Sequence, residues 1–142
     1  MKKILFILTV CLAFISVTIN AQNQSQKKTT AKNYVEVIYF HSKQRCATCI
    51  AIEKYTQEAI NKELASQIKN GEVIFKNIDI SQKNNQAIAE KYKVTWSSLF
   101  IVKHKNGKET SKDMTAFAFG NARTSPDKFK AEIINTIKQM LK

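Results

Sequence analysis

The chain has 142 residues, of which 44% are hydrophobic and 24% charged, and its formal net charge is +12. This length fits one folded domain. Most of the positive charge is lysine scattered over the expected helices and loops, without a compact basic motif, so we expect no nucleic-acid partner. A solvated surface explains these lysines better than attraction to acidic partners or anionic membranes.

The N-terminal segment has the pattern of an export signal. A short basic start, Met1–Lys3, precedes an apolar run over Ile4–Ile19, and Ala21 is a small residue suited to a cleavage site. The run is short for a membrane span of about 20 apolar residues. We therefore expect a cleaved signal peptide over 1–21, an exported protein in the periplasm or outside the cell, and no stable membrane span after cleavage.

The rest of the chain alternates between strand and helix patterns. Residues 22–33 are polar and lack periodicity, which indicates a flexible linker before a domain at 34–142. In chain order, the patterns then predict a strand over Tyr34–Phe40, a helix from Cys46 to about Asn70, a strand over Val73–Ile80, a helix from about Asn84 to Tyr92 capped by Ser81, a strand over Leu99–Val102, a hairpin turn at Asn106-Gly107, a strand over Thr110–Phe119 and a final helix starting at Ser125-Pro126.

This order, β-α-β-α-β-β-α, predicts an α/β fold. Each of the two successive β-α-β units favours a right-handed crossover and parallel pairing, and the hairpin adds an antiparallel edge strand. The segment Leu99–Val102 is apolar on both faces, so we expect it in the centre of the sheet.

Cys46 and Cys49 form a Cys-x-x-Cys motif between the first strand and the first helix. Two thiols at this spacing can close a small disulfide ring. The first thiol lies beyond free backbone N–H groups and the positive end of the helix dipole, which stabilise its thiolate. Because the thiolate is the nucleophile, the motif predicts thiol–disulfide exchange. So local a crosslink adds little stability, which favours redox work over a structural role.

With this topology, the motif resembles the thioredoxin-like superfamily over nearly all of Tyr34–Lys142. The resemblance also rests on local matches at Asn77-Ile78-Asp79, Lys91–Val94, Asn106-Gly107 and Gly120. It implies a thioredoxin-like fold with a central mixed four-stranded sheet flanked by helices. The stretch from Phe40-His41 to Arg45–Cys49 is further similar to a group of small exported thioredoxin-like proteins of Bacteroidota, some of which bear the label of a nitroreductase subunit linked to arsenic genes (ArsF-like).

The resemblance also implies the roles of the two cysteines. Cys46 is the attacking thiol, Cys49 is the resolving thiol, and together they form a redox-active disulfide. On this reading the protein is a thiol–disulfide oxidoreductase whose partners are thiols and disulfides of other proteins, and no cofactor is needed beyond its own disulfide. We also expect a monomer. Exchange runs through a mixed disulfide between Cys46 and the partner.

Several positions depart from the thioredoxin pattern on the strand side of the motif. Arg45 stands where the family has tryptophan; it either favours the Cys46 thiolate as a neighbouring cation or points away into solvent. The family's buried acid and its lysine partner correspond to Tyr39 and Phe75. His41 or water would then have to assist deprotonation of the resolving cysteine.

Further departures lie between the cysteines and in the loop before the third strand. The dipeptide Ala47-Thr48 lacks the proline common in thioredoxins. Ser98 corresponds to the family's cis-proline, and we expect a trans peptide there because a non-proline cis bond costs ~2.5–4 kcal/mol. Trp96 either covers the disulfide as a recognition residue or packs within the loop.

Two other functions remain open at this point. The same two thiols, Cys46 and Cys49, could bind or carry a soft ion such as Cu(I) or As(III), and the absence of proline at Ser98 raises that alternative. We predict no other metal site, because structural zinc usually needs four ligands and the only other candidates are His41 and His104. The third reading is a non-catalytic adaptor with a local disulfide.

Overall fold

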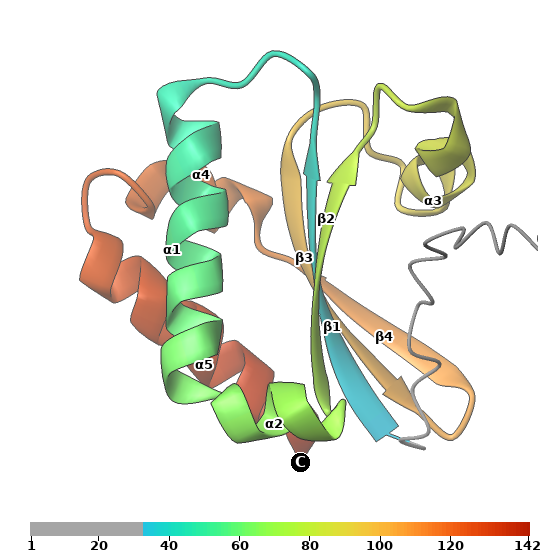
Figure 1. Cartoon of the computed structure of the whole chain (residues 1–142), viewed down its shortest axis with the longest axis vertical. Coiled ribbons are helices and arrows are strands. Elements are labelled where there is room, and N and C mark those ends of the chain that lie inside the picture. The colour runs from blue at the N-terminus through green and yellow to red at the C-terminus, as the bar shows by residue number, and fades with distance from the viewer. Residues whose placement is uncertain (1–32) are drawn as a thin grey trace, which may run out of the picture.

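The computed structural model describes residues 33–142 as a four-stranded sheet with helices on both faces (Figure 1). The strands are β1 (Asn33–His41), β2 (Val73–Asp79), β3 (Ser98–Lys105) and β4 (Lys108–Asp113). The helices are α1 (Ala47–Glu63), α2 (Ala65–Asn70), α3 (Gln86–Lys91), α4 (Thr115–Asn121) and α5 (Pro126–Leu141), with a short 3-10 helix, η1 (Lys83–Asn85). The predicted signal peptide and the predicted linker up to residue 32 lie outside the described residues.

The sheet is mixed, as predicted, and its strand order is β2-β1-β3-β4. Strand β1 is parallel to β2 and antiparallel to β3, and β3 is antiparallel to β4. The central position of Leu99–Val102 is confirmed, but the expected parallel pairing in the second β-α-β unit is wrong. Helix α3 has 6 residues, about 9 Å, which cannot return the chain along the roughly 23 Å of the 7-residue β2. Strand β3 therefore starts where β2 ends and runs back.

Two predicted elements have different bounds in the structure. The long helix predicted up to Asn70 is divided at Leu64, whose buried side chain and non-helical backbone (φ −132°, ψ 27°) separate α1 from α2. The strand predicted over Thr110–Phe119 ends at Asp113, and α4 follows. Met114, Ala118 and Ala122 explain the helix, because they recur every four residues and all three are buried.

The predicted turn and cap residues have mixed outcomes. Asn106 and Gly107 adopt φ values of 52° and 76°, as a tight hairpin turn requires. The predicted cap at Ser81 is wrong, because its hydroxyl donates to Asp79 at 2.7 Å and η1 begins later. Ser125 does occupy the N-cap position of α5, but its side chain makes no capping bond there.

The core lies on both faces of the sheet. On one face, β1 and β3 pack against α1, α4 and α5, and the fully buried side chains there include Val37, Ile52 and Ile133. On the other face, a smaller cluster around Ile38 and Phe40 lies under α3. Within residues 33–142, no helix is both long enough and apolar enough to span a bilayer.

Candidate active site

The two cysteines lie at the start of α1, after the loop that follows β1. Cys46 is the N-cap residue of α1, with an extended backbone (φ −75°, ψ 162°), and its Sγ accepts a hydrogen bond from the backbone N–H of Cys49 at 3.1 Å. A disulfide joins the two residues, whose Cα atoms are 5.0 Å apart. Cys46 is exposed, whereas Cys49 is only 6% exposed. One sulfur is thus open to solvent at a helix N-terminus, and the other lies behind it.

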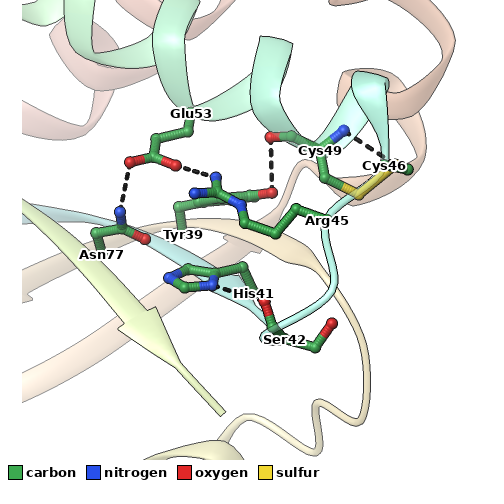
Figure 2. A network of polar contacts seen from close by, with 8 residues as sticks. All are labelled: Tyr39, His41, Ser42, Arg45, Cys46, Cys49, Glu53 and Asn77. Atoms are coloured by element: carbon green, nitrogen blue, oxygen red, sulfur yellow. Dashed lines mark hydrogen bonds and ion pairs between the residues drawn. A yellow bond between two sulfur atoms is a disulfide. The ribbon is translucent and has the colours of Figure 1, made fainter. Parts of the chain in front are cut away.

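Tyr39 is the residue predicted to stand in place of the buried acid of thioredoxins. It is fully buried on β1, and its hydroxyl donates to the backbone carbonyl of Cys49 at 2.8 Å (Figure 2). Burial raises the pKa of Tyr39 above its ordinary value, and interactions with Ser97 and Arg45 only partly oppose that rise. The hydroxyl therefore stays protonated near neutral pH and anchors the Cys49 backbone. Phe75, predicted to replace the lysine of thioredoxins, is partly buried against the core cluster under α1 and α5.

A network of polar side chains extends from Arg45, away from the disulfide. Its Nη2 forms an ion pair with Glu53 on α1, and the amide of Asn77 on β2 donates to the other Glu53 carboxylate oxygen at 2.5 Å. The guanidinium carbon lies 5.7 Å from the centre of the Tyr39 ring. Figure 2 shows the guanidinium directed toward Glu53, with the sulfur atoms at the opposite end of the Arg45 side chain.

His41 lies beneath this network. Its Nδ1 is 3.0 Å from the backbone carbonyl oxygen of Ser42, and its ring stacks on that of Tyr39 with 6.0 Å between centroids. In Figure 2 the imidazole points away from the disulfide. Among the hydrogen bonds of residues 33–142, none joins His41 to Cys46 or Cys49.

The loop before β3 approaches the same end of β1, because Ser98 pairs with Phe40. Ser98 is 4% exposed, and its hydroxyl donates to the Trp96 carbonyl at 3.1 Å. The described residues contain no cis peptide bond, which confirms the trans peptide expected at Ser98. Trp96 is 58% exposed, and its ring lies 5.2 Å from that of Phe119 on α4. The indole therefore packs on one side and remains open to solvent on the other.

The two histidines that are the other candidate zinc ligands lie at opposite ends of the paired strands β1 and β3. His41 ends β1, whereas His104 pairs with Tyr34 near the start of β1. Residues 33–142 contain no group of three or more His, Cys, Asp or Glu placed to hold a metal ion. A soft ion held by the two thiols alone is a different case and stays a prediction.

Glu53 and Asn77 are not among the site residues predicted from the sequence. Glu53 follows Cys49 by four residues, a spacing that puts both on the same face of α1. Nothing in the sequence indicated that Asn77 would come alongside, because that depends on the parallel pairing of Tyr39 with Asn77 in β1 and β2.

The sheet order and the Cys-x-x-Cys pair at the start of the helix after β1 define a thioredoxin-like α/β fold. No protein-family model matches the chain, and no curated protein matches it. Solved structures similar to it include the reduced thioredoxin pre-protein of Schistosoma mansoni, with 21% identity over 77% of this chain and 81% of that chain and a TM-score of 0.49. Fasciola hepatica thioredoxin shares 27% identity over 75% of this chain and 81% of that chain, with a TM-score of 0.48.

Proposed function

We propose that the protein is a thiol–disulfide oxidoreductase that exchanges disulfides with other proteins through Cys46 and Cys49. The observation that supports this most directly is the unequal burial of the two sulfur-bearing residues. Cys46 is exposed at the N-terminus of α1, and Cys49 is 6% exposed. A partner can therefore reach Cys46 but not Cys49, which is the asymmetry that an attacking and a resolving thiol need.

In the reducing direction, exchange proceeds in two displacements. The Cys46 thiolate attacks one sulfur of the partner disulfide, which forms a mixed disulfide and releases the second partner sulfur as a thiolate. The Cys49 thiolate then attacks Cys46 Sγ, which forms the internal disulfide and releases the first partner sulfur. Two electrons pass to the partner, which also takes up two protons. The oxidising direction is the same sequence reversed.

The local geometry favours this chemistry at Cys46. The backbone N–H of Cys49 already donates to Cys46 Sγ, and that bond strengthens when the sulfur carries a negative charge. Tyr39 is not the base for Cys49, because burial raises its pKa and its hydroxyl donates to the Cys49 carbonyl. Because the His41 imidazole also points away from the disulfide (Figure 2), we propose that water accepts the proton of Cys49.

A turnover assay tests the proposed function. The protein is mixed with a disulfide-containing model protein and a dithiol reductant, and the Cys46→Ser variant is the control. We expect the wild-type protein to accelerate reduction and the variant to be inactive. A wild-type rate equal to the uncatalysed background, with the cysteine pair intact, would contradict the proposal. A stoichiometric complex of that inactive protein with Cu(I) or As(III) would favour the carrier reading instead.

We also propose that the protein works outside the cytosol, as the pattern of residues 1–21 suggests. Cleavage after Ala21 leaves Cys46 and Cys49 as the only two cysteines, which suits an oxidising compartment. We likewise propose that the protein is related to the small exported thioredoxin-like proteins of Bacteroidota that its sequence resembles. Expression of the full chain in a bacterial host, followed by N-terminal sequencing, tests export. We expect a periplasmic product starting at Gln22, and an unprocessed cytosolic chain would contradict this.

A further inference from the structure

The ion pair between Arg45 and Glu53 joins the residue before the candidate nucleophile to helix α1. The two side chains are 24% and 22% exposed, so water screens them less than it screens a surface pair. The carboxylate has a second partner, because Asn77 on β2 donates to its other oxygen at 2.5 Å. Three elements thus fix where the positive charge of Arg45 lies: the loop after β1, α1 and β2.

This arrangement keeps the positive charge of Arg45 away from the sulfur atoms. A free cation beside Cys46 would favour its thiolate. Paired with a carboxylate, the same cation leaves only the weaker field of a dipole at a distant point. The Arg45 Nε is buried without a hydrogen-bond partner in the described part of the chain. The pairing with Glu53 therefore leaves one N–H donor of the guanidinium without a hydrogen bond, which costs free energy.

We propose that Glu53 is a positioning residue that limits the reactivity of Cys46 by holding the Arg45 guanidinium away from its sulfur. This inference rests on the proposed function, in which Cys46 is the attacking thiol. Without the Glu53 charge, the Arg45 side chain is free to approach the adjacent thiolate. A stabilised thiolate also stabilises the reduced protein over the disulfide, so the loss of Glu53 makes the disulfide a stronger oxidant.

The experiment compares Glu53→Gln with wild type in the reduced full chain. The pH dependence of alkylation is followed at Cys46, with peptide mass spectrometry to assign the modified residue. We expect a lower midpoint pH in Glu53→Gln, so that the ionised fraction of Cys46 is about threefold to tenfold larger at pH values well below both midpoints. At a pH above the wild-type midpoint, where Cys46 is a thiolate in both proteins, the equilibrium with glutathione should shift toward reduced protein by a similar factor, and a tenfold shift corresponds to about 30 mV.

Glu58→Gln is the matched control. Glu58 lies on the same helix and pairs with Lys54 at 3.9 Å, but the side chains of this pair are 50% and 62% exposed. This substitution removes the same charge from α1, and we expect the midpoint of Cys46 to stay unchanged. Asn77→Ala is a second, milder test, because it removes one anchor of Glu53 and keeps its charge. It should shift the midpoint in the same direction as Glu53→Gln, by less.

A double-variant comparison separates an effect through Arg45 from a direct effect of the carboxylate charge. Arg45→Gln alone should move the midpoint by less than Glu53→Gln does, since the charge of Arg45 is already paired in wild type. Adding Glu53→Gln to Arg45→Gln should then shift the midpoint by less than half of its effect in wild type. A shift in the Arg45→Gln background of half the wild-type effect or more, or no shift in either background, overturns the proposal. If wild-type protein does not equilibrate with glutathione at all, the proposed function fails first.

Discussion

Strand β1 carries two polar networks, one toward each end and on opposite faces of the sheet. Toward its C-terminal end, Tyr39 faces α1 and meets Arg45 and the Cys49 carbonyl. Nearer its start, Glu36 lies on the other face, where it accepts bonds from Lys76 at 2.6 Å and His104 at 3.1 Å. The two positions are an odd number of residues apart, so their side chains point to opposite faces.

The two networks differ in what they contact. The Tyr39 network contacts the backbone of a cysteine, and its charged members come from α1 and the loop before it. The Glu36 network instead ties strands together: Glu109 on β4 lies 3.9 Å from His104 on β3 and bonds Lys91 and Tyr92 at the end of α3. The first network should therefore govern redox chemistry, and the second should govern only stability.

The largest effects are expected at the cysteines themselves. Cys46→Ser should abolish exchange, because it removes the exposed nucleophile. Cys49→Ser should accumulate mixed disulfides with partner proteins, because nothing then resolves them. Non-reducing gel electrophoresis with mass spectrometry measures the trapped species. Equal trapping by the two variants would contradict the assigned roles.

A smaller but distinct effect is expected at the other end of β1. Glu36→Gln should lower the free energy of unfolding by about 1–3 kcal/mol, because a nearly buried carboxylate loses its charge-assisted bonds to Lys76 and His104. Urea unfolding measures the loss. The matched control is Glu132→Gln, whose pair with Lys112 is 3.9 Å long and half-exposed. A change in the glutathione equilibrium of Glu36→Gln would break the contrast between the two networks.

Tyr39→Phe tests the Tyr39 hydroxyl near the C-terminal end of β1, next to Cys49. Loss of the bond to the Cys49 carbonyl should reduce the free energy of unfolding by about 1 kcal/mol. The pH profile of exchange should keep its shape, because the raised pKa of Tyr39 keeps this hydroxyl from acting as the base. Tyr55→Phe is the control, since the Tyr55 hydroxyl makes no hydrogen bond among the described residues. If the rate of exchange by Tyr39→Phe lost one of the pH-dependent limbs seen in wild type, Tyr39 would have a catalytic role.

The smallest effect concerns the dependence of stability on pH through Glu109. Burial alone raises the pKa of Glu109, but its hydrogen bonds from Lys91 and Tyr92 outweigh that and hold the pKa below its ordinary value. The group therefore adds stability at pH values above the unfolded-state pKa, and this contribution is lost as the pH falls through the folded-state pKa. Because the ion pair between Glu109 and Lys91 is partly exposed, we expect it to contribute less than about 1 kcal/mol to the free energy of unfolding. Unfolding of Glu109→Gln across acidic pH should lack this part of the slope, and an unchanged slope would contradict it.

Local patterns in the sequence were enough to predict the strands, the hairpin turn and the start of α1 at the cysteines. They failed where tertiary contacts decide the outcome. The segment after the hairpin turn is predicted as a strand up to Phe119, but burial of Ala118 with its neighbours four residues away, Met114 and Ala122, produces α4. The direction of β3 depends on the length of the connection from β2, and periodicity carries no information about strand direction.

The candidate site was predictable to a similar extent. The positions of Cys46 and Cys49 followed from the motif, and Tyr39 was recognised as the residue that stands where an acid was expected. The charged partner of Arg45 was not, because a salt bridge between a loop and a helix face depends on side-chain directions that a linear sequence does not display. The sequence leaves two alternatives for Arg45, support of the Cys46 thiolate or exposure to solvent, whereas in the structure its charge is paired with Glu53.

The measurement that most directly tests thiol–disulfide exchange at Cys46 and Cys49 is equilibration of the metal-free protein with glutathione redox buffers. The two redox states are quantified by peptide mass after rapid alkylation. We predict a single two-electron transition, with a potential between that of thioredoxin, about −270 mV, and that of the strong oxidant DsbA, about −120 mV. A pair that stays in one state across the whole series of buffers would contradict a redox function for this site.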